Sequence, residues 1–295
     1  MSLAGLSHLR AAQDRLGEAQ ELAAQALRRY EALGDPGGAA AVRAHLGYVC
    51  RERGALPAAV GHLDAALRHF ATAGDPVAVA YIRRLLGACH LETGDLHAAA
   101  AHLEAARATY TRLGNRHGVA TTLRSLGLLR RAEGDLDGSA RLLEHARDIF
   151  QERGDELLTA YAVRALAKTW IRQGRVADAT AALGPVYDTC RRLRDRWGDT
   201  MTLRVQGEAA LARAELSAAE ELLTGSVARW EEIGAEVSLA RSLYTLSLVQ
   251  RARGDGPAAD RSRTRAVRLF AAGSAREHRE LTGGACPSRG PETRR

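Results

Sequence analysis

Apolar residues recur along this chain every three or four positions, with polar residues between them. The segment from Thr121 to Phe150, TTLRSLGLLRRAEGDLDGSARLLEHARDIF, contains two such runs separated by Gly134. This spacing is typical of amphipathic α-helices, and glycine is the residue that most often follows their last turn. The pattern therefore predicts pairs of helices, each with roughly 16 residues and a length of about 25 Å.

The pattern of one helix pair repeats every forty residues. Two columns of the repeat hold small residues in every copy: Ser7, Gly47, Gly87, Gly127, Ala167, Gly207 and Ser247, and, twelve residues later, Ala19, Ala59, Ala99, Ser139, Ala179, Ala219 and Ala259. Glycine inside a helix costs about 1 kcal/mol relative to alanine, so its repeated use indicates close approach of a neighbouring helix. One pair cannot bury its apolar face alone, and the copies are expected to stack into an all-α solenoid.

The order L-x-x-L-G, then G-D-L, then alanine and leucine at fixed steps resembles the tetratricopeptide repeat in its forty-residue bacterial form. The resemblance extends over residues 1–272. It implies a right-handed α-solenoid of about seven hairpins, near residues 1–34, 35–74, 75–114, 115–154, 155–194, 195–234 and 235–272. The LGD junctions are similar to the C-terminal arrays of large actinobacterial regulators of the NB-ARC/SARP or LuxR type. The DNA-binding and ATPase domains of those regulators are not visible here, because no G-x-x-x-x-G-K-[ST] loop occurs.

Two segments depart from the repeat. Gly184-Pro185 falls in the middle of a predicted helix, where proline removes a backbone donor and clashes with the preceding turn, so we expect a kink or break. The junction that follows is irregular, because Arg194 stands in the glycine column. Residues 273–295 are expected to form a short, disordered basic tail, since their end is rich in turn-forming and polar residues.

The amino-acid composition supports an all-helical fold and indicates the cellular compartment. The chain is 46% hydrophobic but only 4% aromatic, which favours close-packed helices over sheets. It contains no apolar run of the roughly 18 residues that a membrane span needs and no signal peptide core, so we expect a cytoplasmic protein without a membrane partner. Cysteine spacing matches neither a zinc site nor a disulfide framework. Cys50 and Cys190 fall in core columns, and Cys286 is expected to be exposed.

The sequence does not indicate an enzyme, a cofactor or a metal site. It lacks G-x-S-x-G, H-E-x-x-H and a phosphate-binding loop, and its glycines stand at turn positions. His62 and His102 share a column, but a metal site needs three or four convergent ligands, so surface histidines are the simpler interpretation. Acidic residues beside the turns, such as Glu92, are interpreted as solvated helix ends.

One column carries candidate binding residues. The net charge of +7 rests on arginine, because Lys168 is the only lysine. Three residues before the first small column, four successive repeats have arginine, and we call this set the arginine ladder: Arg84, Arg124, Arg164 and Arg204. Resemblance to tetratricopeptide folds implies that this column faces the concave groove. Neighbouring groove positions hold Tyr48, Tyr81, Tyr161 and Lys168, and Tyr244 occupies the ladder column in the last repeat.

The ladder suggests an anionic ligand, because guanidinium groups bind carboxylates and phosphates in a bidentate fork. Our leading hypothesis is a non-enzymatic interaction or ligand-sensing scaffold whose basic groove takes an acidic peptide or partner domain. By resemblance, such a scaffold would be part of a bacterial transcriptional regulator. The alternative is a binder of nucleic acid or another anionic polymer, with the ladder on phosphates and Tyr81 or Tyr161 stacked on bases. A third interpretation is that the arginines simply solvate a wet helix face.

Overall fold

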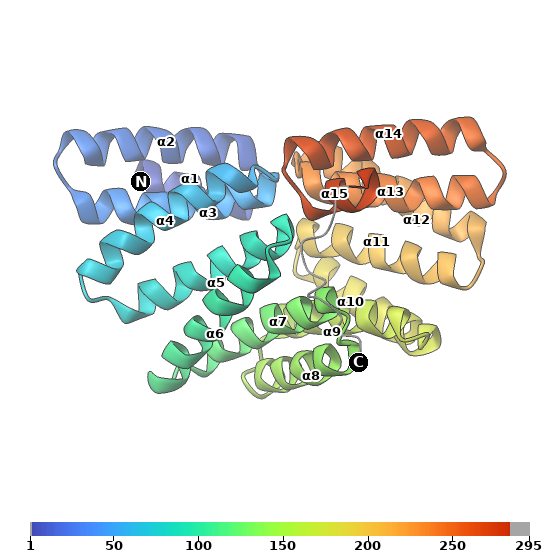
Figure 1. The fold of residues 1–295 in the computed structure, drawn as a ribbon, viewed down its shortest axis with the longest axis horizontal. Coiled ribbons are helices and arrows are strands. Elements are labelled where there is room, and N and C mark those ends of the chain that lie inside the picture. The colour runs from blue at the N-terminus through green and yellow to red at the C-terminus, as the bar shows by residue number, and fades with distance from the viewer. Residues whose placement is uncertain (1, 284–295) are drawn as a thin grey trace, which may run out of the picture.

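The computed structural model describes residues 2–283, which form fifteen α-helices and no β-strand (Figure 1). The helices are α1 (Leu3–Ala12), α2 (Leu16–Ala32), α3 (Pro36–Arg53), α4 (Leu56–Thr72), α5 (Pro76–Thr93), α6 (Leu96–Arg112), α7 (Arg116–Glu133), α8 (Leu136–Glu152), α9 (Glu156–Arg172), α10 (Val176–Arg192), α11 (Arg196–Ala212), α12 (Leu216–Ile233), α13 (Glu236–Ala252), α14 (Gly256–Ala272) and α15 (Arg276–Thr282). The predicted fold class, an all-α solenoid, is confirmed.

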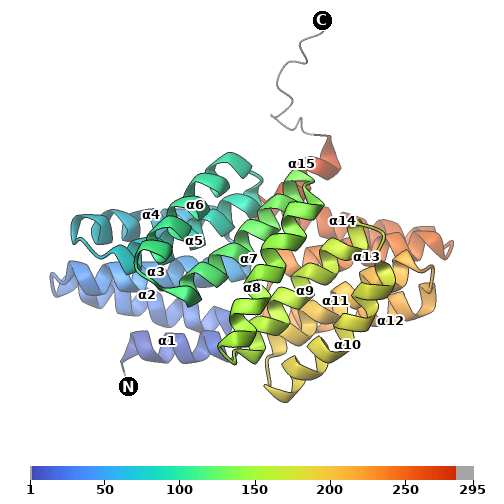
Figure 2. The ribbon, with the colours of Figure 1, turned by 90° about the horizontal axis from the view of Figure 1, so that it is seen from below.

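Helices α1–α14 pair into hairpins that stack in chain order. The stack curves so that the odd-numbered helices lie toward its inside and the even-numbered helices toward its outside (Figures 1 and 2). This curvature brings the first and last hairpins side by side, with α7 and α8 on the opposite side of the molecule (Figure 1). The inner faces of the odd-numbered helices therefore point toward one central region.

Glycines on the odd-numbered helices allow close helix packing. A Cβ atom at Gly127 of α7 would lie 2.7 Å from Cγ of Leu143 on α8 and 3.3 Å from the carbonyl oxygen of Ser139. The side chain of Leu143 is fully buried. The same contact recurs at Gly47, Gly87 and Gly207, which face Leu63, Leu103 and Leu223. The small column thus makes room for a leucine of the second helix, as its repetition indicated.

Aspartate and glycine set the helix boundaries. Asp35 and Asp135 each accept a hydrogen bond from the backbone N–H three residues later, at 2.8 Å, which caps α3 and α8. Gly94 ends α5 in the left-handed conformation, with φ of 84°. Arg194 has φ of 56° in the turn before α11. This junction therefore keeps the geometry of a glycine turn without glycine, at a cost in backbone strain.

Of the kink or break predicted at Gly184-Pro185, the break is wrong, and the kink stays a prediction. Helix α10 runs without interruption from Val176 to Arg192, with Pro185 inside it. Leu183 and Val186, on either side of the proline, are buried, while Pro185 itself is exposed. Packing of the flanking side chains against neighbouring helices holds the helix together despite the lost backbone hydrogen bond.

The predicted disorder of the tail is also wrong for its first part. Residues 276–282 form α15, which begins after the buried Ala275 and carries Glu277, an ion-pair partner of Arg241 on α13. These two anchors order a segment whose composition alone suggested disorder. Residues 284–295, with Cys286, lie outside the described residues.

Two further features bear on the sequence predictions. Cys50 and Cys190 are buried, as their columns predicted. None of the helices within residues 2–283 has both the length and the apolar character needed to cross a membrane.

Candidate binding site on the inner face

The four arginines of the ladder lie on α5, α7, α9 and α11, one on each helix. These helices form the inner layer of the stack (Figure 1). The four side chains differ in burial. Arg164 and Arg204 are 7% and 4% exposed, whereas Arg84 and Arg124 are half-buried. Neighbouring arginines of the ladder repel one another, because the positive charges of Arg84 and Arg164 both lower the pKa of Arg124. The structure thus brings the ladder together, but not as a uniformly open groove.

The rungs on α9 and α11 are bonded within the protein. Arg204 Nη1 lies 2.5 Å from Glu208 Oε1, and Lys168 Nζ lies 3.0 Å from the same oxygen. Arg164 Nη1 donates to the carbonyl oxygen of Gly198 at 3.1 Å. Burial alone would raise the pKa of Glu208, but Lys168 and Arg204 hold it below its usual value. A ligand anion could reach these cations only by displacing Glu208.

Arg84 and Arg124 instead contact aromatic rings. Cζ of Arg84 lies 5.4 Å from the ring centroid of Tyr81, and Cζ of Arg124 lies 6.0 Å from that of Tyr161. Nε of Arg124 is buried and has no hydrogen-bond partner within residues 2–283. Burial, and then repulsion by Arg84 and Arg164, lowers the pKa of Arg124 to about 10. An anion at this position would satisfy the donor and relieve the repulsion.

The predicted tyrosines divide into two groups. Tyr81, 40% exposed, and Tyr161 lie with the ladder, and the hydroxyl of Tyr161 donates to Asp195 Oδ2 at 2.7 Å. Tyr48 is half-buried on α3. Tyr244 packs against the apolar cluster of the last two hairpins rather than standing free. Of the predicted tyrosines, Tyr81 and Tyr161 have rings close to ladder arginines.

The sequence analysis missed the acidic residues of the inner face. Arg51 on α3 pairs with Glu52 at 2.6 Å and with Glu92 on α5 at 2.9 Å. The interpretation of Glu92 as a solvated helix end is wrong, because its side chain is only 16% exposed. Burial raises the pKa of Glu52, although Arg51 opposes this and Arg124 and Arg84 also act on it. Glu52 is thus the acid that partly balances the unpaired rungs.

The forty-residue alignment contained a signal for these residues. Glu52 and Glu92 share one column, eight positions after the ladder column. Lys168 and Glu208 share another, four positions after it, on successive repeats. Opposite or like charges in one column of adjacent repeats face each other once the repeats stack, so this column pairing would have indicated a charged cluster.

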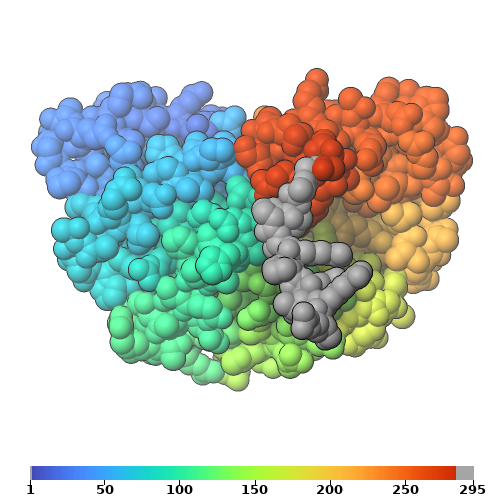
Figure 3. All heavy atoms as spheres, viewed as in Figure 1, coloured from blue at the N-terminus to red at the C-terminus, as the bar shows by residue number. Residues whose placement is uncertain are grey.

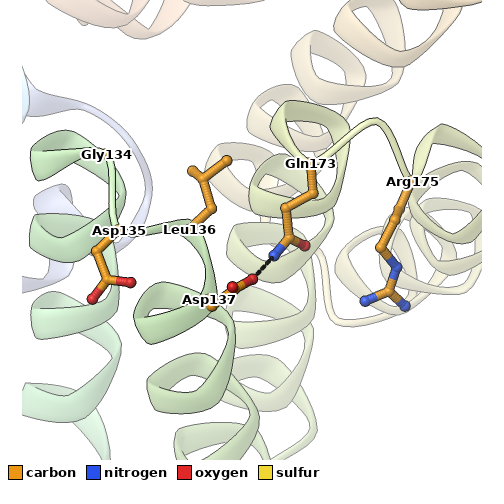
Figure 4. A pocket seen from close by; sticks show the side chains of 6 residues that line it. All are labelled: Gly134, Asp135, Leu136, Asp137, Gln173 and Arg175. Carbon is orange, nitrogen blue, oxygen red and sulfur yellow. Dashed lines mark hydrogen bonds between the residues drawn. The ribbon is translucent and has the colours of Figure 1, made fainter.

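A surface depression of about 570 Å³ lies at the turns after α7 and α9 (Figure 4). Its charged groups are already bonded: Asp137 accepts from Gln173 Nε2 at 2.8 Å, Asp135 caps α8, and Arg175 pairs with Asp178 at 2.8 Å. It therefore lacks the excess charge found at Arg84 and Arg124. In the part of the chain that the structure describes, no three His, Cys, Asp or Glu side chains form a group that could hold a metal ion.

Stacked helical hairpins, a small-residue packing column and a charged inner face define a helical-repeat solenoid. Residues 77–152 match the tetratricopeptide repeat family. The resemblance inferred from the sequence is thus supported for the repeat itself. Comparison with curated proteins gives no match.

Solved structures similar to this chain are helical-repeat proteins of low sequence identity. The Rap conjugation gene regulator of plasmid pLS20, in complex with the Phr* peptide, has a TM-score of 0.75 and 13% identity, over 97% of this chain and 76% of that one. Aspartyl phosphate phosphatase F from Bacillus subtilis has a TM-score of 0.68 and 12% identity, over 99% and 73%. A signal transduction ATPase with a tetratricopeptide repeat sensor, from Pyrococcus horikoshii, has a TM-score of 0.61 and 10% identity, over 95% and 46%. These similarities establish the fold.

Proposed function

We propose that this protein is a non-enzymatic scaffold that binds an acidic peptide or an acidic segment of a partner protein on its inner face. The observation that carries the proposal is the pair of half-buried guanidiniums of Arg84 and Arg124, neither of which forms an ion pair with any of residues 2–283; Arg124 also has a buried donor without a partner among these residues. A side-chain carboxylate would make charge-assisted hydrogen bonds there, which are stronger than neutral ones.

Within this proposal, the ligand contacts two arginines of the ladder, Arg84 and Arg124, rather than all four. Arg164 and Arg204 donate from Nη1 to Gly198 and Glu208, so these terminal nitrogens are already bonded within the protein. Nε of Arg204, like that of Arg124, has no partner within residues 2–283, but Glu208 already neutralises the charge of Arg204. Tyr81 and Tyr161 flank the two free rungs and would contact the apolar part of the ligand. The ligand therefore needs acidic groups on neighbouring residues, not a charge at every repeat.

Comparison supports a peptide ligand and a role in regulation. The pLS20 Rap regulator was solved with a bound peptide, and the Pyrococcus ATPase carries its tetratricopeptide repeats as a sensor. Together with the LGD junctions, this supports the proposal that the chain is the sensing part of a cytoplasmic bacterial transcriptional regulator.

Nucleic acid is the less favoured ligand. Glu52, Glu92 and Glu208 lie among the inner arginines, and these carboxylates would repel a continuous run of phosphates.

Fluorescence anisotropy with a short labelled peptide of alternating Glu and Leu tests the proposal, with a Gln and Leu peptide as the uncharged probe. We expect Arg124→Ala to weaken binding of the acidic peptide by about tenfold or more, because one buried charge-assisted contact contributes on the order of 1 to 3 kcal/mol. Circular dichroism should show unchanged helicity.

Arg141→Ala is the matched control, since Arg141 is exposed on the outer helix α8. Equal weakening by both substitutions would show that only diffuse charge attracts the peptide. Preferential binding of a labelled single-stranded oligonucleotide, with a steep salt dependence, would favour the nucleic-acid alternative.

A further inference from the structure

The two ends of the solenoid meet, although they are far apart in the sequence. Leu16 at the start of α2 is buried in the same apolar cluster as Ala235, Val237 and Phe270 of the last hairpin. Figure 3 shows the surfaces of the first and last hairpins in contact. The seven hairpins therefore form a closed turn, in which the contact between the ends is additional to the contacts between neighbouring repeats.

Glycine makes this closure possible at its tightest point. A Cβ atom at Gly54, in the turn after α3, would lie 2.7 Å from Cγ2 of Val237. A Cβ atom at Gly273, after α14, would lie 2.7 Å from the carbonyl oxygen of Gly54. The backbones of the two ends thus approach at a distance that no larger residue permits.

The closure explains why residue 273 is glycine. Its φ is −81°, an ordinary right-handed value, so the backbone itself does not require glycine. The equivalent position, directly after the second helix of other hairpins, holds exposed leucines: Leu33, Leu113 and Leu193. In the sixth hairpin this position holds Ile233, which is buried in the same apolar cluster as Leu16. Only in the last hairpin is the position glycine, and there an added Cβ would meet the backbone of Gly54.

A polar contact joins the same ends beside the glycines. Arg241 on α13 pairs with Glu277 on α15 at 2.7 Å and with Glu92 on α5 at 3.9 Å. Arg279 on α15 donates to the carbonyl oxygen of Thr93 at the end of α5. Arg241 and its two charged partners, Glu92 and Glu277, are half-buried, and α15 itself contains no buried residue. Helix α15 is thus held mainly by charge and hydrogen bonds, with the partly buried Leu281 packed against the apolar cluster of the last hairpin.

We propose that this contact is a latch: α15 and the turn at Gly273 hold the last hairpin against α3 and α5, and their release opens the turn without unfolding the repeats. Each repeat interface is a continuous apolar surface, whereas the closure consists of Leu16 in the apolar cluster of the last hairpin, a narrow glycine contact and a few ion pairs. Interfaces of this kind open at lower free energy than the helix stack, so opening is a separate equilibrium. The open form would expose the inner face to a partner.

Two variants release the latch by different means. Gly273→Leu inserts a side chain between the ends at a backbone position that tolerates leucine in other hairpins. The double variant Glu277→Gln with Arg279→Ala removes the polar contact. Small-angle X-ray scattering should show a larger radius of gyration for both, with unchanged helicity by circular dichroism. Hydrogen exchange of the backbone amides at residues 51–55 and 91–95 should become at least about tenfold faster.

Ala73→Leu and Glu231→Gln are the matched controls. Ala73 is exposed at the position equivalent to Gly273, and Glu231 pairs with Arg265 between α12 and α14, away from the closure. Neither control should change the radius of gyration. The proposal is wrong if folded Gly273→Leu and the double variant keep the wild-type radius and exchange rates. It is equally wrong if both variants lose helicity, because closure would then be part of the fold rather than a latch.

Discussion

At the scale of single residues, the inner face is governed by the balance between burial and charge pairing. The only lysine of the chain, Lys168, lies beside Arg204 and shares Glu208 with it. Burial, and then the charge of Arg204, lowers the pKa of Lys168 to about 7. One carboxylate between two cations is insufficient to keep both fully charged at neutral pH.

This pKa predicts a dependence of stability on pH. Lysine in the unfolded chain titrates near 10.5, so between about pH 7 and pH 10 the unfolded state binds more protons than the folded state. The contribution of Lys168 to the free energy of unfolding therefore rises with pH across this window and is lowest below pH 7. We expect wild type to gain on the order of 1 to 3 kcal/mol more than Lys168→Met between pH 6.5 and 9.5.

Urea unfolding followed by circular dichroism at the two pH values measures this difference. Comparing the two proteins cancels the titration of groups that they share, such as Cys190, whose pKa burial raises to about 11. Parallel stability curves for wild type and Lys168→Met would show that Lys168 keeps an ordinary pKa.

At the scale of helices, four of the seven hairpins pack through a glycine that faces a leucine. The recurring contact places a leucine of the second helix over a backbone that has no side chain. Dense packing of this kind tolerates little added volume. The intrinsic preference of alanine over glycine in helices is therefore overridden at these positions.

Gly127→Ala tests whether the clash with the neighbouring helix outweighs the higher helix propensity of alanine. A Cβ atom there would lie 2.7 Å from Cγ of the fully buried Leu143, so we expect a loss of about 1 to 3 kcal/mol in unfolding free energy. Gly61→Ala, on the exposed side of α4 with no atom within 4 Å of the added Cβ, should instead gain up to about 1 kcal/mol. Stabilisation by both substitutions would mean that the helices separate easily.

At the scale of the whole molecule, stability combines a linear stack with a closing contact. Each hairpin packs mainly on its two neighbours, so a local weakness need not spread through the array. Pro185 is such a weakness, because it removes one backbone hydrogen bond from α10.

We predict that repeats on either side of α10 open separately. Hydrogen exchange should give a lower opening free energy for residues 195–272 than for residues 36–154. Pro185→Ala restores the missing donor at an exposed position, so it should stabilise the protein by about 1 to 3 kcal/mol and reduce this difference. Uniform exchange over both segments in wild type would contradict the prediction.

The sequence alone predicted the helices, their pairing and the face that carries the ladder. These features follow from local spacing: small residues twelve positions apart allow two helices to touch, and one arginine column must lie on one side of the stack. The charge state of the ladder was not predictable in this way. Among residues 2–283, Arg204 has an ion-pair partner and Arg124 has none, because ion pairing depends on which columns of adjacent repeats face each other.

Only the tertiary structure decided that the ends meet. Each repeat interface turns the next hairpin by a small angle, and whether Gly273 reaches Gly54 depends on the sum of these angles over all repeats. No local pattern encodes that sum. The same contact between the ends orders α15, whose sequence suggested disorder. Glu277 pairs with Arg241 on α13, and Arg279 donates to the carbonyl oxygen of Thr93 at the end of α5, 186 residues earlier in the chain. Local periodicity thus determined the repeat, and the accumulated curvature determined the closed turn.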